Sequence, residues 1–206
     1  MRKDEKREWH NSMSTWQKPS ELCDLVDRCL KHFGSTRVFK ESGFTFWTDA
    51  WIAAHYARLL DAELVKLCLP EPFPDFVLKV GSFERRFEAT EVLDPKRRRG
   101  DEVVQNAQRI ADGGSPVQPD PEENWMTIEQ TIFGLKTASE KKAIKSYSQD
   151  SGLVIYLNWS DLFCEKDEIL SIMQAATEAS GKSYVSLDVL WHGQVYRIWE
   201  NGHAVL

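Results

Sequence analysis

The sequence predicts an α/β protein with a mixed central sheet flanked by helices, and three observations lead to this prediction. Two β-rich runs, residues 74–80 and 83–93, are separated by Gly81-Ser82, a pair typical of a hairpin turn. Residues 153–157 (LVIYL) form a continuous apolar run, as in a strand buried on both faces. Before and between these runs, apolar residues recur at the spacing of amphipathic helices.

The length and composition fit one domain of ordinary size or one domain with an appendage. The chain has 206 residues, of which 42% are hydrophobic, enough to form a substantial core. We interpret residues 1–18 as a polar N-terminal tail and residues 19–206 as a single α/β domain. No apolar run approaches the ~20 residues of a membrane helix, and no apolar stretch follows the charged N-terminus, so we expect neither a membrane partner nor a secretory signal.

Cysteine usage favours a reducing compartment. The four cysteines are scattered and include no CxxC pair, a distribution that argues against both a disulfide framework and a zinc knuckle. Reduced thiols are the rule in the cytoplasm, so we expect a cytoplasmic protein.

The N-terminal half shows two helical patterns. A first helix is expected over residues 20–33, stopped by Gly34, and a second over residues 48–69, ended by Pro70. Between them, residues 36–40 and 43–47 are candidate short strands.

The C-terminal half continues the alternation of helix and strand. A short helix is expected over residues 103–111, a longer one over 127–147 and a last one over 166–179. Residues 183–190 and 194–199 then read as a hairpin that turns at His192-Gly193.

Acidic residues stand in unusual places around the predicted hairpin. Asp75 opens the first strand, while Glu88 and Glu91 lie inside the second, although acids are poor strand formers. Such acids either face water or hold a ligand, and a metal ion is the common ligand where several converge. Glu63 lies on the apolar stripe of the preceding helix, where it either snorkels to water or points into the same site.

The charge distribution is uneven. The net charge of −6 argues against nucleic-acid binding by bulk attraction, yet residues 79–99 contain seven basic and four acidic residues. Arg97, Arg98 and Arg99 stand in a loop and suggest phosphate contacts, with a solvated charged turn as the alternative. The lysines of the helix over residues 127–147 are expected to line a solvated face.

These elements resemble the PD-(D/E)xK nuclease superfamily, whose fold is the restriction-endonuclease-like fold, including bacterial and prophage members. The residues that carry the resemblance are Pro74-Asp75, Glu88-Ala89-Thr90, the helix with Lys142 and Lys145, and the strand at residues 153–157. It covers about residues 48–160. It implies a mixed sheet in an αβββαβ core, here with an extra N-terminal helix and a C-terminal hairpin.

The resemblance also implies a metal site. Asp75 and Glu88 would hold Mg²⁺ or Mn²⁺, and Glu63 would match the acid that this superfamily often carries on its first core helix. The motif lysine is missing, because Thr90 occupies its position. A lysine from elsewhere (Lys79, Lys142 or Lys145) would replace it, or the site is inactive.

Glu91 is open to two interpretations. Strand alternation places Glu88 and Thr90 on one face and Glu91 on the other. Glu91 would then either form an ion pair with a loop arginine or be turned toward the metal by a bulge. We favour Glu88 as the metal ligand.

The function expected from these observations is metal-dependent hydrolysis of phosphodiester bonds in nucleic acid, with DNA as the favoured substrate. The alternative is an inactive restriction-endonuclease-like module that binds DNA or protein. A third reading is an α/β interaction protein without a nucleic-acid partner. The sequence leaves open whether the chain acts alone or as a homodimer.

Overall fold

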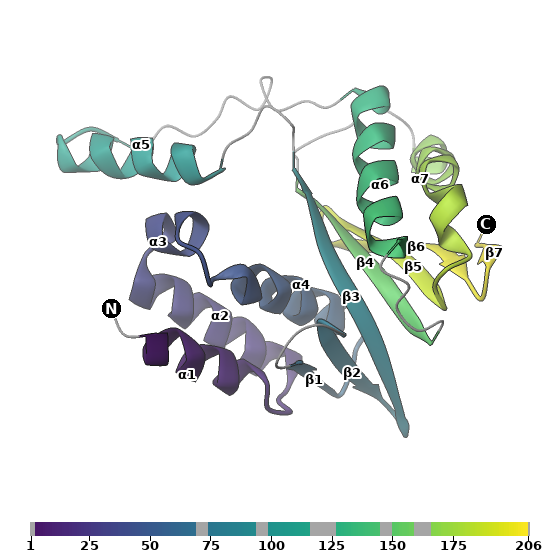
Figure 1. Ribbon diagram of the computed structural model, residues 1–206, viewed down its shortest axis with the longest axis horizontal. Coiled ribbons are helices and arrows are strands. Elements are labelled where there is room, and N and C mark those ends of the chain that lie inside the picture. Colours follow the sequence, from purple (N-terminus) through teal and green to yellow (C-terminus); the bar gives the residue numbers. More distant parts are fainter. Residues whose placement is uncertain are drawn as a thin grey trace.

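The computed structural model describes residues 3–68, 74–93, 99–115, 127–144, 150–158 and 166–205. Within these ranges, seven helices and seven strands build one mixed sheet with helices on both faces (Figure 1). The strands lie side by side in chain order, from β1 to β7. The α/β class is therefore confirmed, and none of the described helices is both long and apolar enough to cross a membrane.

Helices α1 (Lys3–Met13), α2 (Pro19–Phe33) and α3 (Ser35–Lys40) form the N-terminal part, followed by α4 (Thr45–Leu59). The helix expected after residue 19 is confirmed as α2. Residues 3–13, expected as a tail, are helical because charged residues surround a narrow apolar side that ends in the fully buried Met13.

The prediction of two short strands at residues 36–40 and 43–47 is wrong. Residues 36–40 lie in α3, and residues 45–47 form the start of α4. Short apolar runs fit a strand or a buried helix equally well, and tertiary packing decides between them. Here Trp47 is buried against α2, and its indole Nε1 donates a hydrogen bond to the Val26 carbonyl at 3.0 Å.

The second predicted helix was too long. Helix α4 ends at Leu59, where the chain turns through Asp61 with a positive φ of 50°, and strand β1 (Leu64–Leu67) follows. Apolar residues at 60, 64 and 67 also fit a helical spacing. The alternating burial of Val65 and Leu67 instead satisfies the strand period of two.

The central hairpin and the buried strand are confirmed. Strand β2 (Phe76–Val80) pairs antiparallel with β3 (Phe83–Leu93) across a turn in which Gly81 has a φ of 59°. Strand β4 (Ser151–Asn158) runs parallel to β3, and its residues 153–155 are fully buried.

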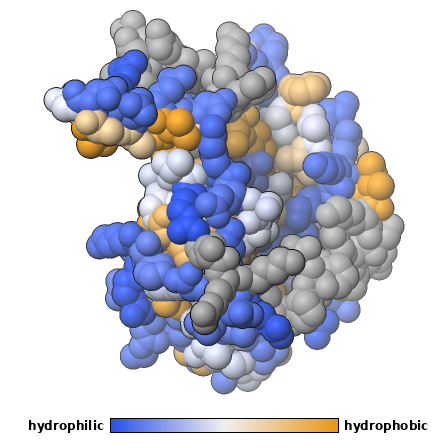
Figure 2. Space-filling view, turned by 60° about the vertical axis from the view of Figure 1, so that its left-hand side comes forward, coloured by the Kyte–Doolittle hydropathy of each residue, from blue (hydrophilic) through white to orange (hydrophobic). Residues whose placement is uncertain are grey.

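Two helices follow β3 along the chain. Helix α5 (Arg99–Ala111) projects beside α3, and α6 (Ile128–Ala143) packs on the sheet before β4 (Figure 1). Figure 2 shows apolar side chains gathered along one side of α5. Ile110 of this helix is 55% exposed. The helices expected at residues 103–111 and 127–147 are thus confirmed in their described parts.

The C-terminal part extends the sheet. Helix α7 (Lys166–Gly181) connects β4 to the parallel strand β5 (Ser186–Trp191). Strand β6 (Gln194–Glu200) then folds back antiparallel and pairs with the short β7 (His203–Ala204). The expected last helix and the hairpin around His192-Gly193 are both confirmed.

The sheet separates two apolar cores. On the face covered by α2 and α4, buried side chains include Tyr56, Phe87 and Val154. On the face covered by α6 and α7, they include Leu135 and Ile155. Successive residues of β3 and β4 therefore point to opposite layers, which decides what each acid of β3 can contact.

Candidate active site

Asp75 and Glu88 are neighbours across the central hairpin. Asp75 immediately precedes β2, and the β2–β3 register pairs Phe76 with Phe87, so Asp75 lies opposite Glu88. Residues paired in this way have side chains on the same face of the sheet. The backbone N–H of Ala89 donates to Asp75 Oδ2 at 2.8 Å, which fixes the position of that carboxylate.

Lys142 reaches the two carboxylates from the last turn of α6. Its Nζ lies 3.1 Å from Asp75 Oδ2 and 2.5 Å from Glu88 Oε2. Thr131, Leu135 and Ser139 mark the buried side of this helix, and Lys142 follows Ser139 by three residues. Residues three or four apart share a helix face, so Lys142 is aimed at the sheet.

We call Asp75, Glu88 and Lys142 the trio. Glu88 is its most deeply buried member. Its side chain is 1% exposed, whereas those of Asp75 and Lys142 are each 17% exposed. Its second oxygen, Oε1, is buried and has no hydrogen-bond partner within the described part of the chain. A buried carboxylate oxygen without a partner is energetically costly, so this atom has an open coordination position.

Charges within the trio shift the pKa values of Glu88 and Lys142. Burial raises the pKa of Glu88, and the nearby Asp75 adds to the increase, while Lys142 opposes it. For Lys142, burial alone would lower the pKa, but the attraction of Asp75 and Glu88 outweighs it and the pKa is raised. Lys142 is therefore a cation at neutral pH, in contact with both acids.

Glu63 does not join this site. It lies on the turn after α4, is exposed, and accepts a hydrogen bond from the backbone N–H of Gly81 at 3.2 Å. The expectation failed because it depended on a helix that extended through residue 63. Here the side chain instead supports the β2–β3 turn.

Glu91 is also directed away from the site. It points to the α4 face of β3, where its Oε1 accepts a hydrogen bond from Asn158 Nδ2 at 2.7 Å. It lines a cavity of about 380 Å³ together with Glu41 and Asp101. Strand alternation had predicted this face, and no bulge interrupts the pairing of β3 with β4.

The remaining predicted residues lie elsewhere on the hairpin, at the start of α5 or outside the described ranges. Thr90 shares the face of Glu88 and is half-buried, and Lys79 lies in β2, two positions beyond Val77 on the strand. Lys145, Arg97 and Arg98 fall outside the described residues, while Arg99 begins α5.

The residues that converge are compatible with a hard divalent cation. Among the described residues, no group of three or more His, Cys, Asp or Glu side chains is placed to hold a metal. Mg²⁺ is commonly held by one or two carboxylates, with waters and substrate phosphates completing its shell. The Asp75 carboxylate and the open Oε1 of Glu88 supply two carboxylates of this kind.

The helical pattern of α6 contained a signal that singles out Lys142. A solvated face is the general expectation for the lysines of this helix, with Lys142 also a candidate to replace the motif lysine. Lys142 stands seven residues after Leu135, close to two helical turns. Lys136 does face solvent, with a side chain that is 59% exposed. The position of Lys142 relative to the apolar stripe therefore distinguishes it.

Comparison with known proteins brings no match: no protein-family model, no curated protein and no solved structure is significantly similar to this chain. Any functional conclusion therefore depends on the geometry of Asp75, Glu88 and Lys142, and on the order of the elements that position them.

Proposed function

We propose that this protein is a metal-dependent nuclease of the PD-(D/E)xK type that hydrolyses phosphodiester bonds, with DNA as the favoured substrate. The observation that carries the proposal is the convergence of Asp75, Glu88 and Lys142, which come from three separate elements. In this proposal Lys142, supplied by α6, takes the role of the lysine that Thr90 replaces in the motif.

The order of elements supports the proposal. Helix α4, strands β1 to β3, helix α6 and strand β4 follow one another in the αβββαβ order of the restriction-endonuclease-like fold, with α5 inserted before α6. The first three strands are antiparallel and β4 is parallel to β3. The two helices of this core lie on opposite faces of the sheet (Figure 1).

Each member of the trio has a definite chemical part in the proposal. Asp75 and Glu88 would hold the cation, and a bound Mg²⁺ or Mn²⁺ would supply the Lewis acidity that activates water and offsets phosphate charge. Lys142 is protonated and would donate hydrogen bonds to a phosphate oxygen as negative charge develops there. The hydrogen bond from Ala89 keeps Asp75 oriented before any ligand arrives.

One observation favours the second candidate, a module that binds nucleic acid or protein without cleaving it. Lys142 Nζ already lies within ion-pair distance of both carboxylates. A buried triad of this kind is a complete structural unit by itself, and ion pairs of this kind also occur for structural reasons.

Substitutions of the trio separate the two candidates. We expect Asp75→Asn, Glu88→Gln and Lys142→Met each to reduce Mg²⁺-dependent cleavage of plasmid and single-stranded DNA by at least about 100-fold, because these groups act on one reacting phosphate. Glu63→Gln is the matched control, since it removes a carboxylate outside the site and should leave cleavage unchanged.

Metal binding supplies a readout that does not depend on turnover. Mn²⁺ binding, followed by electron paramagnetic resonance or calorimetry, should be lost in Glu88→Gln and kept in Glu63→Gln. Binding of Mn²⁺ without cleavage of DNA or RNA would support the non-catalytic module. Absence of both from the folded parent protein would overturn the nuclease proposal.

A further inference from the structure

A second cavity lies on the opposite side of the sheet from the trio. It has a volume of about 370 Å³ and is lined by α4, by the end of β4 and by the turn between β5 and β6. Tyr156 of its wall packs with the core on the α4 face, whereas Glu88 faces α6. The volume falls within the ~300–1,000 Å³ typical of small-molecule sites.

Aromatic rings form one wall of this cavity. Trp51 has two ring neighbours, Tyr156 with centroids 4.6 Å apart and His55 with centroids 4.1 Å apart. All three side chains are only half-buried although Trp51 contacts both of the others. Planar groups at a cavity wall offer a stacking surface, which any nucleobase can use because every base has a π-face.

The polar lining favours an anion. Arg58 is exposed at the cavity and forms no ion pair with any described residue. Among the described residues that line the cavity, none is a carboxylate. A guanidinium without an ion-pair partner in the described part of the chain, beside an aromatic wall, is suited to phosphate, which it can bind with two parallel hydrogen bonds.

Two imidazoles add hydrogen-bonding capacity. His55 lies on α4 one turn after Trp51, and His192 lies in the β5–β6 turn with a positive φ of 50°. Burial lowers the pKa of His55, Arg58 lowers it further, and Asp27 opposes both. A neutral imidazole has one donor and one acceptor, which suits the edge of a base.

We propose that this cavity binds a nucleobase that carries a phosphate group, with the base stacked on the Trp51 wall and the phosphate at Arg58. Its position agrees with a general property of α/β sheets, in which ligands bind beyond the carboxyl ends of parallel strands. Tyr156 and Leu190 stand near those ends of β4 and β5.

The ligand has two sources that share this chemistry: a free mononucleotide and an unpaired nucleotide in a single strand. The proposal does not require cleavage at the trio, because the cavity lies on the other face of the sheet. The binding experiment therefore uses the full chain carrying Glu88→Gln, which keeps a single-stranded probe intact if the proposed nuclease activity exists.

Equilibrium dialysis with nucleoside monophosphates and with short single-stranded oligonucleotides tests the proposal. We expect Trp51→Ala to weaken binding about 5- to 150-fold, the range for loss of one stacked base. Arg58→Gln should weaken it at least about fivefold and reduce its salt dependence. Trp51→Phe should keep most of the affinity. This variant keeps the proposal testable if Trp51→Ala fails to fold.

Matched controls are Phe83→Ala and Arg109→Gln, exposed positions outside the cavity, which should bind like the parent. Binding of monophosphates that depends on Trp51 and Arg58 would identify a free nucleotide as the source. The same dependence seen only with oligonucleotides would identify a strand. No binding of either probe at millimolar concentration, or binding that both cavity variants leave unchanged, would overturn the proposal.

Discussion

At neutral pH the buried carboxylate of Glu88 is held in place by the ammonium group of Lys142. Because the folded-state pKa of Glu88 is raised, its ionisation opposes folding as pH rises through that pKa. The pKa of Lys142 is raised as well, so its stabilising contribution is present below the unfolded value of 10.5 and is lost as pH rises through the folded value. The charges of Glu88 and Lys142 therefore stabilise the fold when both are present, and each destabilises it when the other is lost.

Lys142→Met should lower the free energy of unfolding by about 3 kcal/mol at pH 7.5, since removal of one partner leaves a buried charge uncompensated. The loss should shrink near pH 4.5, where Glu88 takes up a proton and no longer needs a cation. Urea denaturation at the two pH values measures the difference.

Lys136→Met is the control for this prediction. Lys136 lies on the same helix, is 59% exposed and forms only a 4.0 Å pair with Glu140, so its substitution should change stability by less than about 0.5 kcal/mol. An equal loss for Lys142→Met at both pH values would show that Glu88 is not the group stabilised by Lys142.

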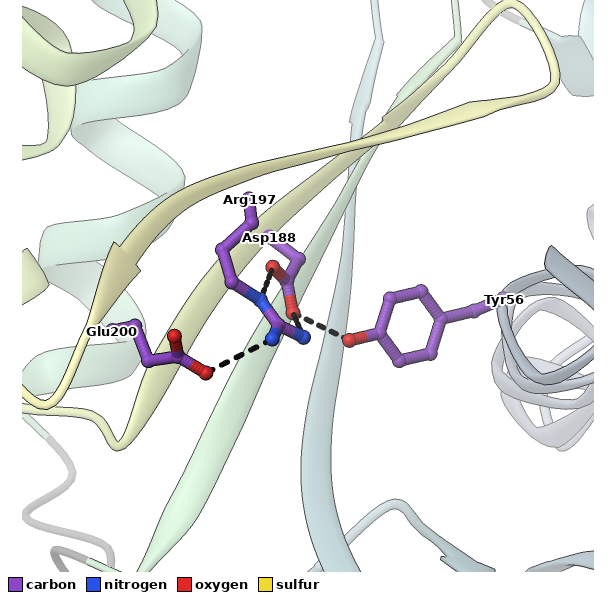
Figure 3. Close-up of polar contacts among 4 residues, drawn as sticks. All are labelled: Tyr56, Asp188, Arg197 and Glu200. Atoms are coloured by element: carbon purple, nitrogen blue, oxygen red, sulfur yellow. Dashed lines mark hydrogen bonds and ion pairs between the residues drawn. The ribbon is translucent and has the colours of Figure 1, made fainter. Parts of the chain in front are cut away.

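A second buried polar group joins helix α4 to the C-terminal strands. Asp188 of β5 is fully buried and receives a hydrogen bond from the Tyr56 hydroxyl of α4. Arg197 of β6 completes the group, with its Nε 2.9 Å from Asp188 Oδ1 and its Nη1 3.0 Å from Glu200 (Figure 3). The buried charge of Asp188 is thus compensated by side chains from two other elements, α4 and β6.

We expect Arg197→Met to destabilise the protein by about 3–5 kcal/mol, because it leaves Asp188 without a counter-charge. Tyr56→Phe removes one hydrogen bond to a charged group and should cost about 1.5–3 kcal/mol. Thermal and urea denaturation of both variants provides the comparison.

Glu200→Gln serves as the control, since its side chain is 45% exposed and its pair with Arg197 lies at the surface. It should cost less than about 1 kcal/mol. A larger loss for Glu200→Gln than for Tyr56→Phe would contradict the assignment of Asp188 as the centre of the group.

The overall charge of the protein constrains how nucleic acid would bind. The chain has 32 acidic and 26 basic residues, so a polyanion must be attracted locally rather than by net charge. The densest basic run of the sequence is Lys96 to Arg99, whose last residue begins α5.

Replacement of Arg97, Arg98 and Arg99 by glutamine should weaken binding of DNA at 50–100 mM salt and flatten its salt dependence. Each lost phosphate contact reduces the slope of log K against log[salt] by roughly 0.9. Fluorescence anisotropy over a salt series gives this slope directly.

A variant with Arg7, Arg28 and Lys31 replaced by glutamine carries the same change of net charge on exposed N-terminal helices. It should bind DNA like the parent. Equal slopes for the two triple variants would exclude the arginine run as the contact site.

Much of the sheet was predictable because its signals are local. The glycine of the β2–β3 turn, the continuous apolar run of β4 and the glycine at the β5–β6 turn each specify one conformation within a few residues. The segments at 36–47 and 60–67 were not predictable in this way. Their apolar residues fit two periods, and contacts with α2 and with β2 decided between them.

Local patterns in the sequence were sufficient to predict the α/β class and the central hairpin, because turn residues and strand alternation act over short distances. Local patterns narrowed the remaining choices without settling them: the apolar stripe of α6 favoured Lys142, and strand alternation placed Glu91 on the other face of β3 unless a bulge intervened. The fold settled that Lys142 contacts both acids, that no bulge turns Glu91 toward them, and that Glu63 lies outside the site. These outcomes depend on where α4 ends and how α6 packs on the sheet, which are set by contacts between residues far apart in the chain.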